Sequence, residues 1–234
     1  YMEIIRLVDD LVYFKNVIPN HKKWLEAIEN TVNENITDWY AWGDMNPYSI
    51  EQAKGGNKQY GMSKSVYFNE EPDFITTTIL DAINTVSEEY QNIVNVGEDN
   101  HGSYSQGFTI GKYYVGMQSK GLHRDVEYDE KEYSFVFYLN DDYEGGEINF
   151  PNLDIMFKPE AGSILIFPSL DEKYLHQMLP MISGFKYIIA HFWIHGPSHG
   201  FITKENKKPV RGVERRPQFV VLSITERIIL LKSS

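Results

Sequence analysis

The feature that most constrains the fold is a series of short β-type segments in the second half of the chain. Each segment is rich in β-branched and aromatic residues, and turn-forming residues separate it from the next. The segments are residues 108–115, 133–140, 147–150, 155–157, 163–167 and 185–195. Strands of this length and spacing predict a sandwich, a jelly roll or a barrel.

The first hundred residues have a different character. Residues 74–93 carry apolar side chains at the spacing of an amphipathic helix with one buried face. Residues 21–30 indicate a second, shorter helix, whereas residues 11–18 have the composition of a strand. Residues 33–72 look irregular. The order is therefore mainly helices first and strands afterwards.

These patterns predict one domain that spans residues 1–234. Residues 1–100 would supply helical support and substrate loops, residues 105–195 a β core, and residues 196–234 a C-terminal extension. The expected fold class is mainly β with flanking helices (α+β), with the N-terminal helices packed on the β core. A chain of 234 residues can bury one substantial core.

The composition excludes several classes of site and partner. The chain has no cysteine, so it has neither disulfides nor thiolate metal sites. Its net charge of −11 disfavours a nucleic-acid partner, because the phosphate backbone repels an acidic surface. It has no apolar run of about 18 residues, the length that spans a membrane. The N-terminus lacks the layout of a secretory signal. We therefore expect a cytoplasmic protein.

Two histidines and one aspartate form the main candidate for a metal site. His123 and Asp125 are two residues apart, so both side chains fall on the same side of an extended segment. His176 would join them from a different strand. Two His and one carboxylate, with coordination positions left open, are typical of non-haem Fe(II) oxygenases. The His-x-Asp pair alone is weak, because most such pairs are ordinary surface or turn residues.

A lysine in the last predicted strand suggests an anionic ligand. Alternation along residues 185–195 places Lys186 on one face with otherwise apolar residues. Burying an unpaired ammonium is costly, so an anion bound inside the fold would explain it. The alternative is that Lys186 lies in water at the mouth of the strand. His191 and His195 fall on the other face, and we interpret them as structural or surface residues.

The ordered set of motifs between residues 105 and 195 resembles the catalytic domain of prolyl 4-hydroxylases. This family is a branch of the Fe(II)/2-oxoglutarate-dependent dioxygenases. The motifs are Tyr114-x-Gly116, His123-x-Asp125, Tyr138-Leu139-Asn140, Gly145-Gly146-Glu147, Pro159-x-x-Gly162, His176 and Gly184-x-Lys186. The resemblance implies a double-stranded β-helix core, which is a cupin-like jelly roll.

The resemblance also implies an activity and a set of roles. Fe(II) would be bound by three catalytic residues: His123, Asp125 and His176. Lys186 and Tyr138 would bind the distal carboxylate of 2-oxoglutarate, and Tyr114 would line the same pocket. The reaction would use O2, with ascorbate as reductant, and would hydroxylate a peptidyl proline while releasing succinate and CO2. Such roles imply a peptide or protein partner that contains proline.

The chain departs from the family mainly around the substrate. Tyr187 and Phe192 stand where many members have tryptophan, and Ile148 where many have threonine. Phe192 is thus a candidate substrate-binding residue in a reshaped pocket. The lysine anchor favours the collagen-modifying type over the nucleic-acid demethylases, which usually use arginine at this position, and the two cations bind differently.

Four questions remain open from the sequence. The substrate could instead be a free amino acid, a small metabolite or a nucleobase, or the chain could be a non-catalytic jelly-roll binding module. Trp39, Tyr40 and Trp42 could stack on a proline ring, or they could simply fill the core. The basic segment 204–216 and the apolar segment 219–231 have no assigned role, and the oligomeric state is unknown.

Overall fold

The computed structural model describes residues 1–34, 40–41, 62–67, 74–94, 103–104, 107–116, 121–125 and 131–194. The strands are β1 (Glu3–Val8), β2 (Leu11–Lys15), β3 (Tyr40–Ala41), β4 (Met62–Tyr67), β5 (Ser103–Tyr104), β6 (Gly107–Tyr114), β7 (Lys131–Tyr138), β8 (Glu144–Gly145), β9 (Ile148–Phe150), β10 (Ile155–Phe157), β11 (Ser163–Pro168), β12 (Gln177–Met178), β13 (Met181–Ser183) and β14 (Phe185–Ile194). The helices are α1 (His21–Glu34) and α3 (Phe74–Val94), with short 3-10 turns η2 (Pro151–Leu153) and η3 (Glu172–Tyr174).

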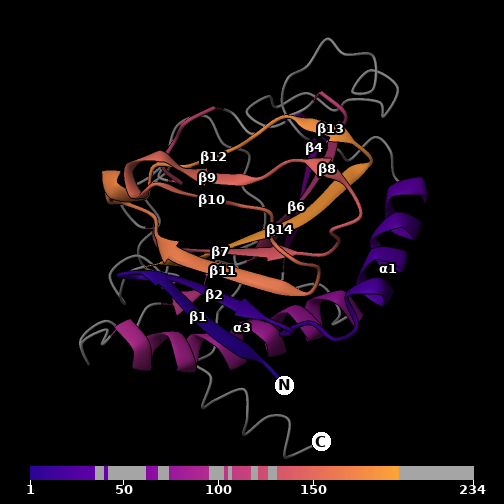
Figure 1. Ribbon diagram of the computed structural model, residues 1–234. Helices are drawn as coiled ribbons and strands as arrows, with labels where there is room; N and C mark the ends of the chain where they lie inside the picture. Colours follow the sequence, from indigo (N-terminus) through magenta and orange to yellow (C-terminus); the bar gives the residue numbers. More distant parts are fainter. Residues whose placement is uncertain are drawn as a thin grey trace, which may run out of the picture.

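Antiparallel sheets face each other and form a jelly roll. The large sheet has nine strands, in the order β1-β2-β11-β7-β14-β6-β4-β3, with β5 paired to β14. Opposite it lie a three-stranded sheet, β10-β9-β12, and the two-stranded pair β13-β8. Figure 1 shows this smaller layer above the large sheet, with α3 below the sheet and α1 at the right. The predicted fold class, mainly β with flanking helices, is confirmed.

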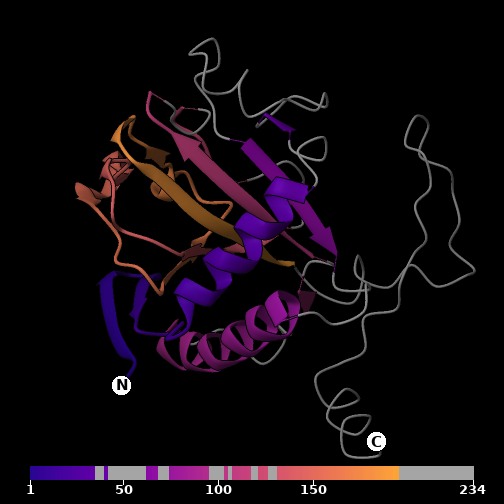
Figure 2. The ribbon, with the colours of Figure 1, turned by 90° about the vertical axis from the view of Figure 1, so that its right-hand side faces the viewer.

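Side-chain alternation gives the large sheet two buried faces. One face packs against the helices, with Phe14, Phe137 and Ile189 in one cluster with Trp24 of α1 and Ile83 of α3. Figure 2 shows both helices on this side of the sheet. Each large apolar side chain buried here contributes about 1.5–3 kcal/mol. Burial on both faces explains why the strands β7, β11 and β14 are apolar along most of their length.

The other face of the large sheet points into the jelly roll. Its inner core contains Tyr13, Tyr138, Leu165 and Phe167 from the large sheet and Phe150 from the small one. This inner face is where the functional side chains described below are placed.

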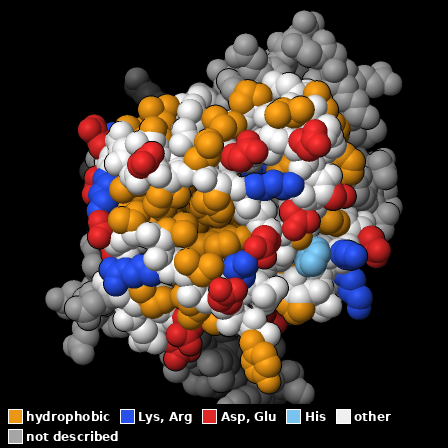
Figure 3. Space-filling view, in the orientation of Figure 1, with side chains coloured by type: hydrophobic (Ala, Val, Ile, Leu, Met, Phe, Trp, Pro, Cys, Tyr) orange, Lys and Arg blue, Asp and Glu red, His pale blue; other side chains and the backbone are white. Residues whose placement is uncertain are grey.

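Hydrophobic side chains also gather on the outer surface shown in Figure 3, over the area where Figure 1 shows β10 facing the large sheet. Partly buried residues of β1 and β10 pack against the inner core: Ile5, Leu7, Ile155 and Phe157. The inner core therefore extends to the edge strands of both sheets.

The N-terminal part is less helical than predicted. Its first element is a β1–β2 hairpin at one edge of the large sheet, and β4 extends the other edge by pairing with β6. The strand expected over residues 11–18 stops at Lys15, because Asn16 adopts a left-handed φ of 57°. The backbone amides of Val17 and Ile18 then bond to the carbonyl of Gly162.

Neither of the two described helices is long and apolar enough to cross a membrane. The predicted C-terminal extension, residues 196–234, lies outside the described residues, as do Trp39 and Trp42. Tyr40 lies in β3, where only the backbone is described.

Candidate metal and co-substrate site

The structure brings the two predicted histidines together by backbone pairing. His123 lies between β6 and β7, and His176 lies between η3 and β12. The two form an isolated antiparallel bridge, in which each backbone amide donates to the other's carbonyl at 2.9 Å. Their ring centroids are 4.5 Å apart. Backbone hydrogen bonds therefore hold the segment that contains His123 against the segment that leads into β12, without the help of a metal ion.

Asp125 completes a group of three ligand atoms. His123 Nε2 is 3.4 Å from Asp125 Oδ1, and His176 Nε2 is 3.7 Å from Asp125 Oδ2. The three ligand atoms lie within 4.8 Å of one another. The predicted set is therefore close enough to share one ion.

Backbone carbonyls fix which ring nitrogens face the ion. His123 Nδ1 is 2.6 Å from the carbonyl of Gly121, and His176 Nδ1 is 3.1 Å from the carbonyl of Tyr174. A carbonyl can only accept, so each Nδ1 carries the proton and each Nε2 presents a lone pair. Two such nitrogens and a carboxylate suit a divalent transition metal. The residues present therefore fit Fe(II).

The surroundings keep Asp125 ionised. Burial acts to raise its pKa, but His176, His123 and the nearby Ser134 hydroxyl together outweigh burial and hold the pKa well below its usual range. Ser134 is buried and hydrogen-bonded to Ser169 at 2.8 Å. The site can therefore supply a negative ligand at neutral pH.

Lys186 is the second part of the site. Its side chain is only 1% exposed, so the alternative that it lies in water is wrong. Its Nζ donates to the carbonyl of Gly146 at 2.6 Å and lies 5.0 Å and 5.5 Å from the ring centroids of Tyr138 and Tyr143. Burial lowers the pKa of Lys186 to about 7, although the charge of Glu147 acts to raise it. A single carbonyl does not compensate a buried ammonium, whereas an anion would.

The hydroxyl of Tyr138 is also poised for a ligand. Tyr138 is 1% exposed, and its hydroxyl has no hydrogen-bond partner among the described residues. Native structures rarely leave a buried hydroxyl unsatisfied. Beside a buried ammonium, an unused donor of this kind indicates a place for an anionic group.

The glycine turn before β9 holds the anchor in place. Gly145 and Gly146 have φ angles of 74° and 66°. A Cβ at Gly145 would lie 2.3 Å from the carbonyl oxygen of Pro180, so only glycine fits there. The carbonyl that accepts from Lys186 comes from this turn.

Comparison with known proteins agrees with this geometry. Residues 109–195 match the family model described as the 2OG-Fe(II) oxygenase superfamily. This segment is similar to the members of that superfamily. It contains the three candidate metal ligands as well as Tyr138 and Lys186. The resemblance predicted from the motifs is thereby confirmed for residues 109–195.

Individual relatives point to the prolyl hydroxylases. The chain is 37% identical over 65 residues to a putative prolyl 4-hydroxylase of Acanthamoeba polyphaga mimivirus, a match that covers 25% of this chain and 26% of that protein. The chain thus spans about a quarter of the length of this curated relative.

Two solved structures share the fold of this chain. One is a viral collagen prolyl hydroxylase from Paramecium bursaria Chlorella virus-1, with a TM-score of 0.55, 18% identity, and coverage of 80% of this chain and 96% of that one. The other is a Pseudomonas putida prolyl-4-hydroxylase, with a TM-score of 0.59, 13% identity, and coverage of 81% and 94%. They support the jelly-roll fold.

The strand register changes the position of one residue predicted to line the co-substrate pocket. Lys186 pairs with Tyr113, whereas Tyr114 pairs with Phe185, so Tyr114 lies on the face opposite Lys186. Tyr113 is buried on the inner face, and burial followed by the charge of Asp125 raises its pKa. Tyr113, one residue before the predicted Tyr114, is therefore the tyrosine of β6 that shares a face with Lys186. The adjacent tyrosine pair was the available signal, but choosing between them requires the register.

The remaining candidates are distributed over both faces of β14. Phe192 pairs with Ser134 on the inner face, at the end of the oxygenase core that holds the metal ligands. His191 is fully buried on the other face, where its ring lies 5.8 Å from that of Phe135. It does not join the group of three ligands. Trp39, Tyr40 and Trp42 cannot be placed, because their side chains lie outside the described residues.

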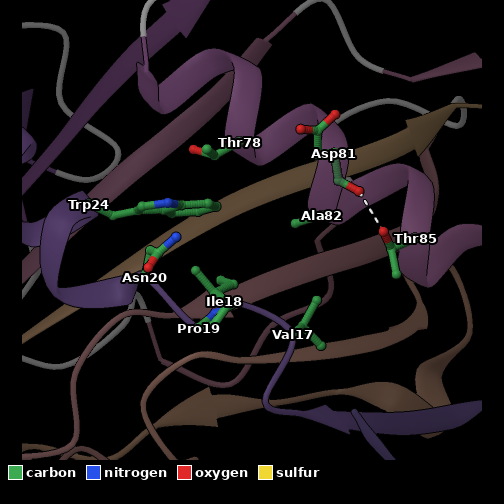
Figure 4. Close-up of a pocket in the computed structure, with 9 residues that line it drawn as sticks. All are labelled: Val17, Ile18, Pro19, Asn20, Trp24, Thr78, Asp81, Ala82 and Thr85. Carbon is green, nitrogen blue, oxygen red and sulfur yellow. Dashed lines mark hydrogen bonds between the residues drawn. The ribbon is translucent and has the colours of Figure 1, made fainter. Parts of the chain in front are cut away.

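A separate cleft of about 180 Å³ lies between α1 and α3 on the helical side of the oxygenase (Figure 4). Its walls combine apolar Ile18, Trp24 and Ala82 with polar Asn20 and Asp81. None of the predicted site residues lines it. It is therefore distinct from the site inside the jelly roll.

Proposed function

We propose that the chain is an Fe(II)- and 2-oxoglutarate-dependent dioxygenase that hydroxylates an unactivated C–H bond, with a peptidyl proline as its substrate. One observation carries the proposal. The three-ligand group and the buried Lys186 are both associated with the inner face of β7, at Ser134 and Tyr138 respectively. These positions are four residues apart, or about 13 Å along the strand. A dicarboxylate bound between them would have the metal ligands at one end and the Lys186 ammonium at the other, with the side chains and the ion spanning the rest of this distance.

In this proposal His123, Asp125 and His176 hold Fe(II), which when bound supplies the activation of O2. Lys186 and Tyr138 hold the distal carboxylate of 2-oxoglutarate, and Tyr113 closes the wall between the two ends. The rings of Phe150 and Phe167 lie 5.4 Å and 4.8 Å from that of His176. These two aromatic side chains exclude water from the metal site and orient the imidazole ring of His176. The balanced reaction converts substrate, O2 and 2-oxoglutarate into hydroxylated substrate, succinate and CO2.

Three observations support proline as the substrate. The mimivirus relative is named a putative prolyl 4-hydroxylase, and its identity of 37% is confined to 65 residues. The co-substrate anchor is a lysine, and the net charge of −11 disfavours a nucleic-acid substrate. A free amino acid or a small metabolite is the main alternative substrate.

Incubation with Fe(II), 2-oxoglutarate and ascorbate tests the proposal on a panel of proline-rich peptides. We expect a peptide product heavier by one oxygen atom, located on proline by fragmentation in the mass spectrometer, together with an equal amount of succinate. A matched peptide with alanine in place of proline should remain unchanged. Succinate without peptide modification would contradict the proline substrate. No succinate with any substrate would favour a binding module.

The pH dependence of co-substrate binding follows from Lys186. Its pKa is about 7 in the free protein, and an adjacent carboxylate would raise it, so binding should take up a proton. Affinity for 2-oxoglutarate should therefore fall as the pH rises above about 7, by up to about tenfold per unit. The charged groups that act on Lys186 are Glu147 and Lys158. Calorimetry of the metal-loaded protein in buffers of different ionisation enthalpy measures the proton uptake. An affinity that does not change with pH would contradict the assignment.

A further inference from the structure

Tyr143 is a buried tyrosine beside Lys186 that the proposed function does not yet use. It lies between β7 and β8, and its side chain is 4% exposed. Its ring centroid is 5.5 Å from Lys186 Nζ and 4.7 Å from Lys158 Nζ. Lys158 Nζ also donates to the backbone carbonyl of Tyr143 at 2.6 Å. The backbone and the ring are therefore held in place from the side of β10.

Gly146 lies against both the tyrosine ring and the anchor lysine. A Cβ built on Gly146 would lie at ordinary contact distance, 3.4 Å, from a ring carbon of Tyr143 and from the side chain of Lys186, and 2.6 Å from Sδ of Met181. The tyrosine ring and the lysine stem therefore border the same glycine. The ammonium of Lys186 has the ring of Tyr138 at 5.0 Å and the ring of Tyr143 at 5.5 Å.

The hydroxyl of Tyr143 is an unused donor. Like the hydroxyl of Tyr138, it is buried without a hydrogen-bond partner among the described residues. Burial, followed by the charges of Asp141 and Glu147, raises the pKa of Tyr143, so the hydroxyl keeps its proton. Leaving one buried hydroxyl unsatisfied costs about 1–3 kcal/mol. Two such hydroxyls around one buried ammonium form a coherent site for a carboxylate.

We propose that the Tyr143 hydroxyl is a further donor to the distal carboxylate of the co-substrate, and so helps to select a dicarboxylate ligand. This inference rests on the proposed function, because it assumes that 2-oxoglutarate reaches Lys186. The carboxylate would accept from the hydroxyls of Tyr138 and Tyr143 and from the ammonium of Lys186. Two neutral donors would then supplement a lysine whose charge is weakened by burial.

Replacement of Tyr143 by phenylalanine tests the inference in the Mn(II)-loaded protein. We expect 2-oxoglutarate to bind about tenfold more weakly, since a hydrogen bond to a charged group is lost. Oxalate has the chelating end of the co-substrate without the distal carboxylate, and its affinity should not change. Affinity for Mn(II) alone should also stay the same. The melting temperature should be equal or higher, because an unsatisfied hydroxyl has been removed.

Tyr187→Phe is the matched control. The hydroxyl of Tyr187 is also buried without a partner among the described residues, but Tyr187 follows Lys186 directly in β14 and therefore lies on the opposite face of the strand. This variant should leave 2-oxoglutarate affinity unchanged. Unchanged 2-oxoglutarate affinity in Tyr143→Phe would overturn the inference, as would an equal loss for oxalate. A wild-type protein that binds Mn(II) but no 2-oxoglutarate would instead overturn the proposed function.

Discussion

Replacing His176 with alanine is expected to abolish metal binding by this protein. Only His123 and Asp125 would remain, and two ligands from one short segment do not enclose an ion. Loss of partners that merely support a ligand costs about 10–100-fold in metal affinity, so loss of a ligand itself should exceed that. Titration with Fe(II) under anaerobic conditions, or with Mn(II), measures the change directly.

The thermal stability should reveal the same loss independently of any activity. A ligand present at about 100 times its dissociation constant stabilises the folded protein by about 2.7 kcal/mol, so the wild type should melt at a higher temperature when metal is added. His176→Ala should show no such increase. Its metal-free form should also be less stable, because the ring packs between Phe150 and Phe167.

A second histidine provides the control for this experiment. His191 is as deeply buried as His176, but it lies on the helix-facing side of β14 and outside the group of three ligands. His191→Ala should lower the melting temperature through lost packing, yet keep the increase on adding metal. If His176→Ala retained that increase, or if His191→Ala lost it, the assignment of the ligands would be wrong.

The strands that the sequence predicted well are those buried on both faces. Residues 133–140, 163–167 and 185–195 overlap β7, β11 and β14 within two residues at each end. Their apolar character is continuous because one side meets the helices and the other meets the inner core. The edge strands were harder. β4 (Met62–Tyr67) begins with a polar sequence, MSKS, and pairs through its backbone with β6.

In the candidate site, too, some residues could be predicted from the sequence and others could not. His123, Asp125 and His176 were predicted from residue type and order, and the structure brings them together. The choice of Tyr114 over Tyr113 was wrong because a shift of one residue reverses the face of a strand. Tyr143 could not be recognised at all from the sequence. Its position beside Lys186 depends on a tertiary contact between the segment after β7 and strand β14, which residue type and spacing do not reveal.

Replacing Lys186 with methionine should have opposite effects on stability and on binding. The free protein keeps this ammonium 1% exposed with one carbonyl as its hydrogen-bond acceptor, and burial lowers its pKa to about 7. Methionine fills a similar volume without a charge, so the ligand-free protein should become more stable by about 1–4 kcal/mol at neutral pH. Chemical denaturation measures this difference.

The pH dependence of that stability has a definite sign. In the wild type the unfolded chain binds the Lys186 proton up to its ordinary pKa of 10.5, whereas the folded chain releases it near pH 7. The unfolded state therefore holds more protons between these values, and the free energy of unfolding should rise with pH across this range. The methionine variant should lack this contribution. Its stability advantage over the wild type should thus shrink as the pH increases from about 7.

Binding of 2-oxoglutarate should change in the other direction. Removing one partner of a buried charge pair costs about 2–5 kcal/mol, so the affinity of Lys186→Met should fall by about 100-fold or more, while affinity for metal stays within a few-fold. Lys112→Met is the matched control, since Lys112 is also buried, with its Nζ 4.7 Å from the ring centroid of Tyr187, which lies on the helix-facing side of β14. A lysine that served only to complete the fold would lose stability when replaced and would leave 2-oxoglutarate affinity unchanged. A variant that is more stable but no longer binds 2-oxoglutarate would instead show that the buried charge of Lys186 destabilises the fold and serves to bind the ligand.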